Sequence, residues 1–488
     1  MCSNQGYPYT EMVRCMEVRA FIVAKKSRNG DGAKGGRKID GRNPGITKGR
    51  LAIVEKQRPK QAREADDRWS WVERCVWTDS MLTALEKGVK GGKWFSLIDK
   101  VSSRKNLKVS WEKVRKNEGS SGVDRQSISL FERHADDNLH ALREELKNRR
   151  YIPRSVVRVY IPKPGSKERR PLGIPTVRDR IVQTALRNVL EPIFEKKFGE
   201  HSYGFRPQRS SKDALRRVQE LLNDGYQWVV DADIKKYFDS IDHEVLMEEV
   251  EKEVSDGRVL DLIRSYLKQS ITDELKMWEP EGGTPQGAVI SPLLANVYLH
   301  PIDEAMRARG YQVVRYADDL VILCRSKAEA QEALTYLRKL LEERKLRLNT
   351  EKTHIVDATQ KGGFDFLGYH FERGYRWPRK KSDKKLRDAI KAKTKRTNGN
   401  HMQCIIAQIN PILRGWFNYF KHSHKNTFPG VDGWVRMRLR SILRKRRGGK
   451  GRGRGQDHNR WPNAYFQESG LLTITEAHTF LCQSLQRY

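Results

Sequence analysis

Residues 313–324 read Val-Val-Arg-Tyr-Ala-Asp-Asp-Leu-Val-Ile-Leu-Cys, and this stretch decides the fold of the chain. Apolar, largely β-branched residues stand on both sides of two adjacent acids, which predicts a hairpin with the acids at its turn. Asp-Asp is also ordinary turn chemistry, so the pair alone leaves a purely structural role open. The flanking runs are apolar enough to be buried, which would place the two carboxylates at the edge of a core.

A second group of acids lies at residues 227–239, which read Gln-Trp-Val-Val-Asp-Ala-Asp-Ile-Lys-Lys-Tyr-Phe-Asp. The pattern predicts a buried strand that ends in acids, followed by a helix through residues 244–251. Two strands that end in aspartates suit a pair of Mg²⁺ ions, because Mg²⁺ prefers carboxylate oxygens and substrate phosphates. Such a pair can activate an attacking 3′-hydroxyl and stabilise a leaving pyrophosphate. We expect Asp318 to share the metals with Asp233, and Asp319, whose side chain diverges from that of Asp318, to have a looser role.

The two acidic stretches carry a family resemblance. Tyr316–Asp319 resembles the polymerase signature of reverse transcriptases, and residues 233–243 resemble their first catalytic motif. Further motifs follow in the order found in group II intron-encoded reverse transcriptases, also called maturases. They are Ile161–Pro164, Arg170–Thr176, Ser202–Pro207, Gly283–Gly287, Ser291–Asn296, Leu348–Thr353 and Phe364–Gly368. The match runs from about Gly119 to Leu472, and the shared order makes it far more specific than any one motif.

This resemblance implies an α+β fold of the right-hand polymerase type. We expect fingers and palm over residues 66–375, with an antiparallel sheet flanked by helices, and an all-helical thumb and maturase region over residues 376–488. Residues 1–65 are rich in Gly and Lys and cannot bury enough apolar surface to offset chain entropy, which predicts a basic, disordered extension. The alternative for this extension is a basic arm that orders on RNA.

The resemblance also implies the ligands of the metals and of the triphosphate. Asp233, Asp318, Asp319 and the backbone carbonyl of Ile234 would hold two Mg²⁺ ions, for which Mn²⁺ can substitute. Lys163 and Arg170 would clamp the triphosphate, supplying positive charge where phosphoryl transfer spreads negative charge. Arg169 competes with Arg170 for this role, because one extra residue separates Lys163 from the Arg-Pro-Leu-Gly sequence.

Two further residues match positions near the incoming nucleotide. Phe238 matches the bulky residue that stacks under the sugar and excludes a 2′-hydroxyl, so it would select deoxynucleotides; its alternative is a core aromatic. Gln286 would lie near the nucleotide and the primer terminus. Its alternative is a structural one, because a Pro-Gln-Gly turn has conformational reasons of its own.

Charge along the chain points to a polyanionic partner. The 488 residues include 95 Lys and Arg against 61 Asp and Glu, a formal net charge of +34. Residues 66–375 carry only +5 of this surplus, whereas residues 1–65 carry +9 and residues 376–488 carry +20. The basic ends therefore favour nucleic acid as the partner, although the charge alone identifies no chemistry.

The C-terminal region predicts helices that combine a core face with a cationic face. Apolar residues recur at helical spacing from Ile405 to Phe420 and are expected to form core, and Pro411 suggests a fresh helix start. A second apolar stripe, from Val435 to Leu443, lies opposite a row of arginines with no acid between Gly433 and Gly455. A solvated face normally mixes charge signs, so binding to a phosphate backbone is favoured. The RNA-binding candidates are Arg414, Arg436, Arg440, Arg444 and Arg447.

Several protein classes are disfavoured. No run of 18 apolar residues occurs, which excludes a membrane-spanning helix. The six cysteines lie far apart with no Cys-x-x-Cys pair, so a thiolate zinc site and a secreted disulfide scaffold are both disfavoured. The chain ends at Tyr488 without the Cys- and His-bearing endonuclease domain of many relatives, so we expect no DNA cleavage by it. With no targeting signal, the expected location is a bacterial cytosol or nucleoid, with an organelle as the alternative.

The resemblance predicts an RNA-directed DNA polymerase that binds its group II intron RNA, assists splicing and copies the intron into DNA during retrohoming. Its partners would be the intron RNA, an RNA template with a DNA primer, deoxynucleoside triphosphates and target DNA. One alternative is chiefly an RNA-binding splicing maturase, against which the three intact aspartates argue. Another is a domesticated reverse transcriptase in repair or antiphage defence. An RNA-dependent RNA polymerase is the least favoured, because Phe238 should reject ribonucleotides.

Overall fold

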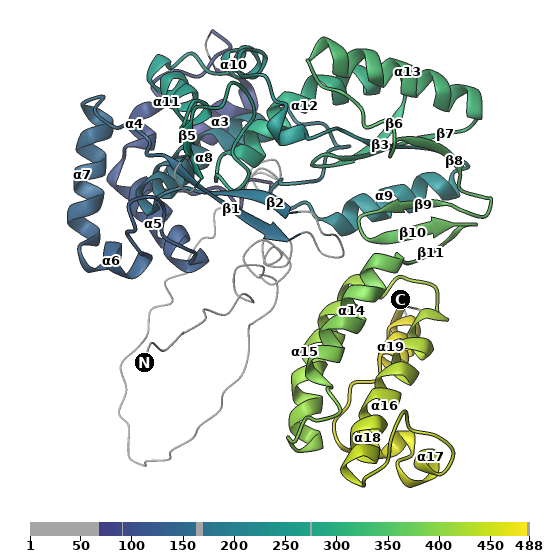
Figure 1. Cartoon of the computed structure of the whole chain (residues 1–488). Helices are drawn as coiled ribbons and strands as arrows, with labels where there is room; N and C mark the ends of the chain where they lie inside the picture. The colour runs from purple at the N-terminus through teal and green to yellow at the C-terminus, as the bar shows by residue number, and fades with distance from the viewer. Residues whose placement is uncertain (1–67, 90, 163–168, 274–275, 486–488) are drawn as a thin grey trace, which may run out of the picture.

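The structure is a computed structural model that describes residues 68–89, 91–162, 169–273 and 276–485 (Figure 1). The extension predicted at residues 1–65 and the predicted ligand Lys163 lie outside the described residues. The described chain is a mixed α+β protein with two four-stranded sheets, a three-stranded sheet and a helical C-terminal region. No helix in this part of the chain is both long and apolar enough to cross a membrane.

The fingers consist of helices around a small sheet. Their helices are α3 (Asp79–Lys87), α4 (Ile98–Val101), α5 (Arg104–Asn117), α6 (Ile128–Arg133), α7 (Ala135–Lys147) and α8 (Val177–Glu195). Their strands are β1 (Val156–Pro162), β2 (Arg169–Ile174), β4 (Ile271–Asp273) and β5 (Lys276–Trp278), in the order β2-β1-β4-β5. Hydroxyl groups of Thr78, Ser103, Ser127 and Thr176 accept from backbone N–H groups three residues on and so fix the starts of four helices.

The palm is built on a four-stranded antiparallel sheet of order β6-β7-β3-β8. Its strands are β3 (Trp228–Asp233), β6 (Gln312–Tyr316), β7 (Asp319–Cys324) and β8 (His354–Asp357). Alternate side chains of each strand point to opposite faces, so Val230 packs into one hydrophobic cluster and Val229 into another. The central strands are thus apolar on both faces, which keeps their ends in a fixed place.

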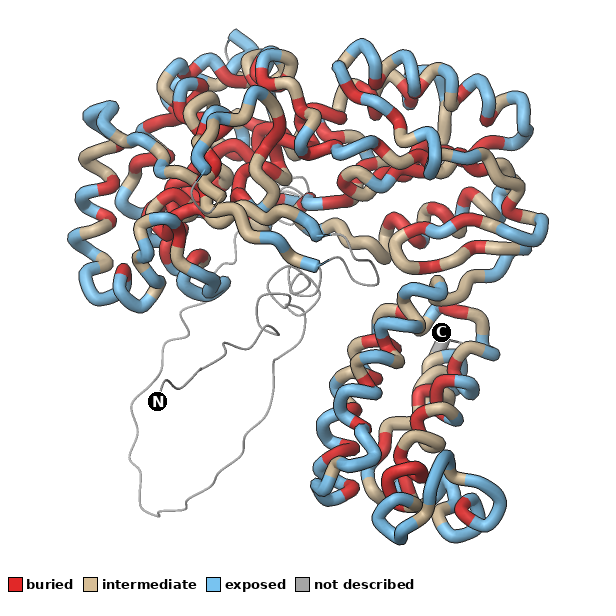
Figure 2. Tube along the Cα trace, in the orientation of Figure 1, coloured by how far each residue is buried: buried red, intermediate tan, exposed pale blue. Residues whose placement is uncertain are grey.

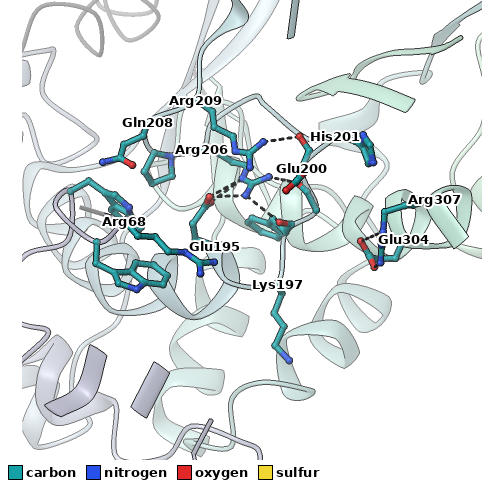
Figure 3. A pocket seen from close by; sticks show the side chains of 15 residues that line it. Arg68, Glu195, Lys197, Glu200, His201, Arg206, Gln208, Arg209, Glu304 and Arg307 are labelled. Atoms are coloured by element: carbon teal, nitrogen blue, oxygen red, sulfur yellow. Dashed lines mark hydrogen bonds and ion pairs between the residues drawn. The ribbon is translucent and has the colours of Figure 1, made fainter. Parts of the chain in front are cut away.

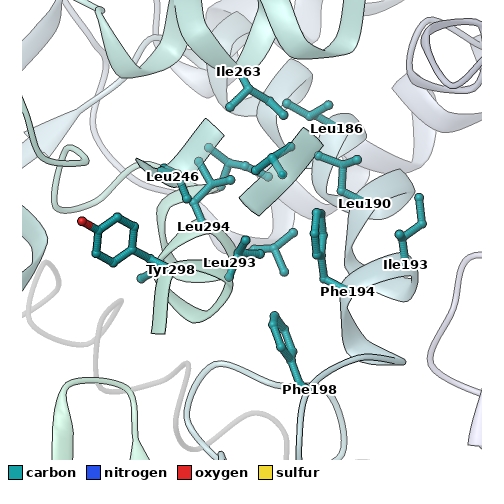
Figure 4. Close-up of a cluster of buried hydrophobic side chains, with 14 of the residues drawn as sticks. Leu186, Leu190, Ile193, Phe194, Phe198, Leu246, Ile263, Leu293, Leu294 and Tyr298 are labelled. Carbon is teal, nitrogen blue, oxygen red and sulfur yellow. The ribbon is translucent and has the colours of Figure 1, made fainter. Parts of the chain in front are cut away.

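Different elements pack against the two faces of the palm sheet (Figure 1). One cluster contains residues of α10 (His243–Glu251), α11 (Gly257–Leu267), α12 (Ser291–Ala308) and α13 (Lys327–Glu343). The other contains residues of α9 (Ser211–Asn223) and of a three-stranded sheet formed by β9 (Phe364–Phe366), β10 (Tyr369–Glu372) and β11 (Tyr375–Pro378). Figure 4 shows part of the first cluster, where side chains of α8 such as Leu190 and Phe194 face Leu293 and Leu294 of α12. Fingers and palm therefore share one core.

The C-terminal region is all-helical, as predicted, and α14 begins a few residues beyond the boundary expected at residue 375. Its helices are α14 (Lys380–Lys393), α15 (Met402–Phe420), α16 (Thr427–Arg446), α17 (Gln456–Arg460), α18 (Asn463–Glu468) and α19 (Ile474–Leu485). Figure 2 shows their buried sides facing one another and their exposed sides facing outward. The apolar face of this thumb belongs to the same cluster as β9–β11, so the thumb packs against the underside of the palm.

The predicted helix start at Pro411 is wrong, because α15 continues through this residue without a break. Proline lacks one backbone N–H and costs a helix one hydrogen bond. The apolar face that surrounds it, including Ile405, Ile409, Leu413 and Trp416, is buried on both sides of the proline. Tertiary packing of that face outweighs the local cost.

Candidate active site

The hairpin predicted at residues 313–324 is confirmed: β6 and β7 pair antiparallel, and the acids lie where they meet. Tyr316 pairs with Asp319, so Ala317 and Asp318 form the turn between the strands. Ala317 has φ +60°, in the left-handed region that non-glycine residues seldom occupy. The turn is therefore a strained one that its surroundings must hold in place.

The register of the sheet brings the predicted carboxylates together. Asp233, the last residue of β3, pairs directly with Asp319, the first residue of β7, and Asp318 precedes it in the turn. The three aspartates come from segments about 85 residues apart in the chain. Sequence reasoning could anticipate that two strands end in acids, and the antiparallel pairing of β3 with β7 places those ends side by side.

Burial raises the pKa values of two of these carboxyl groups, those of Asp318 and Asp319. Burial, and then the negative charge of Asp233, raise the pKa of Asp318, although Arg170 and Arg315 oppose the rise. Desolvation by the surrounding protein and the charge of Asp318 raise the pKa of Asp319 to about 6, even though this side chain reaches solvent. Negative charge is thus concentrated at one end of the sheet.

Asp231 is a fourth carboxylate that the sequence reasoning missed. Burial, followed by the charges of Asp365 and Asp233, raises its pKa to about 7. The available signal was the period of two along a strand, which puts Asp231 on the same face of β3 as Asp233. Its neighbour across the strand pair, Val321, belongs to the cluster beneath the palm. Asp231 therefore lies on the thumb side of the sheet, beside the catalytic candidates.

The donor set fits a hard divalent cation. Carboxylate oxygens are the ligands that Mg²⁺ prefers, and a bound cation would offset the negative charge that raises the pKa of Asp318 and of Asp319. Within the described ranges, no group of three or more His, Cys, Asp or Glu side chains is close enough to hold a metal ion as it stands. Lys352 is a direct counter-ion of Asp233, with its Nζ 3.0 Å from Oδ2 of that carboxylate.

The raised pKa values predict how the stability of the metal-free protein depends on pH. A carboxyl group whose pKa is higher in the folded state stabilises the fold while protonated, and this contribution is lost as pH rises through the folded pKa. For Asp231 and Asp319 the loss falls as pH rises from about 4 to about 7. In EDTA, Asp231→Asn should melt a few degrees above wild type at pH 8 and close to it at pH 5.

Differential scanning fluorimetry across this pH range makes the comparison. Asp137→Asn, at an exposed site on α7, is the matched control and should follow wild type throughout. Mg²⁺ at pH 8 should raise the melting temperature of wild type, because it binds the ionised carboxylates. A melting profile of Asp231→Asn that runs parallel to wild type from pH 5 to pH 8 would contradict the prediction.

The segment 348–353 supports Asp233 from the opposite side. The backbone N–H of Asn349 donates to the carbonyl of Asp233 at 2.8 Å, and the N–H of Asp233 faces Oγ1 of Thr353 at 3.3 Å. Ile234, whose carbonyl was predicted as a metal ligand, is buried and forms an antiparallel bridge with Leu348. The sequence reasoning quoted this motif but gave no role to Lys352, which the fold brings to Asp233.

The predicted nucleotide-binding residues Arg170 and Gln286 lie in contact. Nε of Arg170 donates to Oε1 of Gln286 at 2.8 Å, and the N–H of Gly173 donates to the carbonyl of Gln286 at 2.6 Å. The positive charge of Arg170 also acts on Asp318, whose pKa it lowers. Between the two competing arginines, this geometry favours Arg170 over Arg169.

Phe238 lies close to the same group. It sits in a short 3₁₀ helix at Tyr237–Asp239, and its carbonyl accepts from the N–H of Thr284 at 2.8 Å, two residues before Gln286. Its ring is 8% exposed and lies edge-on to that of Phe205, with 6.4 Å between the centroids. Phe205 is 48% exposed and was not singled out from the sequence. The two rings form an aromatic surface whose inner member is the predicted steric residue.

The thumb arginines divide into two groups. Arg414 and Arg447 are exposed and Arg436 is half-buried, which suits contact with a phosphate backbone. Arg440 does not suit it: the side chain is 3% exposed and donates to the carbonyl of Trp461 and to Oδ1 of Asn463. Arg444 is half-buried and its Nη1 pairs with Oδ2 of Asp457 at 2.5 Å. The helical pattern could not reveal this, because residues 457–463 return from farther along the chain to cover these two arginines.

A cavity of about 660 Å³ is lined by residues that include Glu195, Glu200 and Glu304 (Figure 3). Its lining includes Arg206, whose guanidinium forms two hydrogen bonds from Nε to the carboxylate of Glu195 and donates to the carbonyl of Ser202 at 2.8 Å. None of Asp231, Asp233, Asp318 and Asp319 lines it. These contacts of Arg206 help to hold the loop at Ser202–Pro207 in place.

A right-hand fold with aspartates at the ends of adjacent palm strands defines a template-directed nucleic acid polymerase. Residues 161–371 match the family described as reverse transcriptase (RNA-dependent DNA polymerase). Residues 383–461 match the maturase-specific domain of group II introns.

Individual relatives agree with these matches. Protein YkfC of Escherichia coli K12 is 35% identical over 291 residues, which cover 52% of this chain and 76% of that protein. The group II intron-encoded protein LtrA of Lactococcus lactis subsp. cremoris is 38% identical over 198 residues, which cover 40% of this chain and 32% of LtrA. The chain belongs to the family of group II intron-encoded reverse transcriptases and maturases.

Among solved structures, a partial Cas6-RT-Cas1–Cas2 complex matches with a TM-score of 0.34 and 28% identity over 51% of this chain and 41% of that one. The matched region of LtrA is about a third of that protein's length.

Proposed function

We propose that this chain is an RNA-directed DNA polymerase that also binds its group II intron RNA, assists splicing and copies the intron into DNA. The observation that carries the polymerase assignment is the pairing of Asp233 with Asp319 beside the turn that holds Asp318. The match of residues 383–461 to a maturase-specific domain supports intron RNA as the partner over a domesticated role without an intron.

Different residues would carry out different parts of nucleotide addition. Magnesium ions bound by Asp233, Asp318, Asp319 and the carbonyl of Ile234 would supply activation of the primer 3′-hydroxyl and stabilisation of pyrophosphate. Arg170, held by Gln286 and with its charge lowering the pKa of Asp318, would meet the triphosphate, where positive charge stabilises the transferred phosphoryl group. Lys163 would share this role.

Selection of deoxynucleotides would rest on the aromatic surface of Phe238 and Phe205. A buried ring has little freedom to move aside, so Phe238 can exclude a 2′-hydroxyl by contact alone. Its packing against Phe205 and against the segment that carries Gln286 would hold it beneath the sugar. The same segment, residues 283–287, would thus set both the position of the triphosphate and the identity of the sugar.

The polymerase proposal is tested by primer extension. The full chain is mixed with an RNA template, an annealed DNA primer, the four deoxynucleoside triphosphates and Mg²⁺. Extension that needs Mg²⁺ or Mn²⁺ and that prefers deoxynucleotides to ribonucleotides is the expected result. No extension by the wild-type chain would overturn the proposal.

The maturase proposal predicts how intron RNA binding depends on salt. Replacing Arg414, Arg436 and Arg447 together by glutamine should flatten the slope of log affinity against log salt by about 2 to 3, since each phosphate contact contributes about 0.7 to 0.9. Filter binding of the folded intron RNA from 50 to 300 mM salt measures the slope.

The matched control removes three positive charges elsewhere. Lys327, Arg338 and Lys339 belong to α13, on the face of the palm away from the thumb (Figure 1). Their replacement by glutamine changes the net charge of the chain equally and should leave the slope close to wild type. If both triple variants lose slope alike, the thumb arginines have no special place in the RNA interface.

A further inference from the structure

Arg315 stands immediately before the signature Tyr316–Asp319, and its side chain is 1% exposed. A guanidinium cannot lose its charge inside a protein, and burying it without full compensation is costly. The residue is too deeply buried to meet a nucleotide or a primer. A role for Arg315 must therefore act through the residues that it contacts.

The guanidinium is held from α12. Nε lies 2.8 Å from Oδ1 and 3.0 Å from Oδ2 of Asp303, and Nη2 lies 2.5 Å from Oδ2. Asp303 is itself only 4% exposed, so the pair is desolvated on both sides. Nη1 donates to Oδ1 of Asn296, one further residue of α12, at 3.0 Å. These contacts leave the guanidinium a single orientation.

The guanidinium of Arg315 also contacts the strained turn. Nη1 also donates to the backbone carbonyl of Ala317 at 3.0 Å. Ala317 is the residue with φ +60°, and its carbonyl belongs to the peptide that enters Asp318. A left-handed alanine is unfavourable by about 1 kcal/mol, so a fixed donor on this carbonyl helps to keep the turn in that conformation.

The segment at His201–Pro207 forms hydrogen bonds with the backbone of Arg315 and with the side chain of Asn296. The N–H of Arg315 donates to the carbonyl of His201, and the N–H of Tyr203 donates to the carbonyl of Arg315. Nδ2 of Asn296 donates to the carbonyl of Gly204 at 2.8 Å. Asn296 thus joins the guanidinium to this loop, and the turn is held both from within and from its edge.

We propose that Arg315, locked by Asp303 and Asn296, is a positioning residue that fixes the carbonyl of Ala317 and thereby the direction in which Asp318 presents its carboxylate. The proposal rests on the polymerase function proposed above. On this proposal, the buried ion pair between Arg315 of β6 and Asp303 of α12 aligns the proposed metal ligand Asp318, in addition to stabilising the fold.

Arg315→Lys tests this, because lysine keeps the charge beside Asp303 but lacks the fork that reaches Asp303, Asn296 and Ala317 together. We expect kcat for primer extension to fall by about 100-fold with KM for the nucleotide nearly unchanged, since small misplacements of a catalytic group cost that much. Mn²⁺ binding to the protein alone, followed by electron paramagnetic resonance, should weaken as well.

Arg344→Lys is the matched control. Arg344 is half-buried and its Nη2 pairs with Oε1 of Glu249 at 2.7 Å, and it forms no hydrogen bond with the loop at Ser202–Pro207 or with residues 316–319. This variant should lose stability without losing kcat or Mn²⁺ binding. Equal losses of kcat in the two variants at equal loss of stability would overturn the proposal.

A second variant and a second measurement keep the proposal testable. If Arg315→Lys does not fold, Asn296→Ala replaces it, since that change leaves the Arg315–Asp303 pair and removes the link to Gly204. If wild type shows no extension, the polymerase function fails, and Mn²⁺ binding still decides the positioning role. Unaltered Mn²⁺ binding in the folded variant would then refute it.

Discussion

Replacing Asp318 by alanine should abolish DNA synthesis on an RNA template, with a loss in the rate of primer extension of about 10³-fold or more, as when a principal charge-stabilising group is removed. The carboxylate lies in the turn beside the paired Asp233 and Asp319, so its removal takes away a proposed metal ligand while leaving both strands intact. Single-turnover extension under saturating nucleotide measures the rate.

Stability distinguishes this loss from unfolding. Burial raises the pKa of Asp318, which means that its ionised form is held at a cost to the fold. Asp318→Ala should therefore melt at or above the temperature of wild type in EDTA, and its affinity for intron RNA should be retained. Asp261→Ala, at an exposed carboxylate of α11, is the control and should extend primers normally. Extension by Asp318→Ala at the control rate would remove Asp318 from the active site.

Gly204→Ala should be nearly as damaging, although the residue has no functional group. A Cβ on Gly204 would lie 2.2 Å from the backbone nitrogen of Ala317 and 2.8 Å from the carbonyl carbon of Tyr316. Backbone atoms of a paired strand cannot swing aside as a flexible side chain can, so the turn that carries Asp318 must shift. We expect extension to fall by about 100-fold and the free energy of unfolding to fall by about 1 to 3 kcal/mol.

Gly257→Ala separates the steric effect from the general effect of adding a methyl group. No heavy atom lies within 4 Å of a Cβ at this position, at the start of α11. This variant should match wild type in rate and stability. Wild-type extension by Gly204→Ala would show that the loop and the turn can separate without harm, and it would also weaken the case for the Asn296 link.

The parts of the fold that follow local patterns were predictable from the sequence. The hairpin at residues 313–324 and the strand before Asp233 are set by apolar runs and a turn, and both occur as expected. The cross-strand register was not predictable, because no local signal says which residue of β3 faces Asp319. The ion pair between Lys352 and Asp233 was missed for the same reason, since it joins segments 119 residues apart.

Long-range packing also explains where local reasoning failed. Arg440 follows the cationic pattern of its helix, yet the return of Trp461 and Asn463 turns it into a buried donor. Pro411 carries a signal for a helix start, and the buried face of α15 overrides it. In both cases the decisive contact comes from a part of the chain whose position only the tertiary structure supplies.

The shared core of the thumb and β9–β11 has a consequence for how polymerases of this design can be recombined. Phe364, Phe371 and Tyr369 pack in one cluster with α15 and α16. A chimera cut at the start of α14 would therefore pair the underside of one palm with a thumb shaped for another and leave mismatched apolar surface at the joint. A thumb that is to be transferred to another polymerase should therefore begin before Phe364 and include β9–β11 as well as the helices.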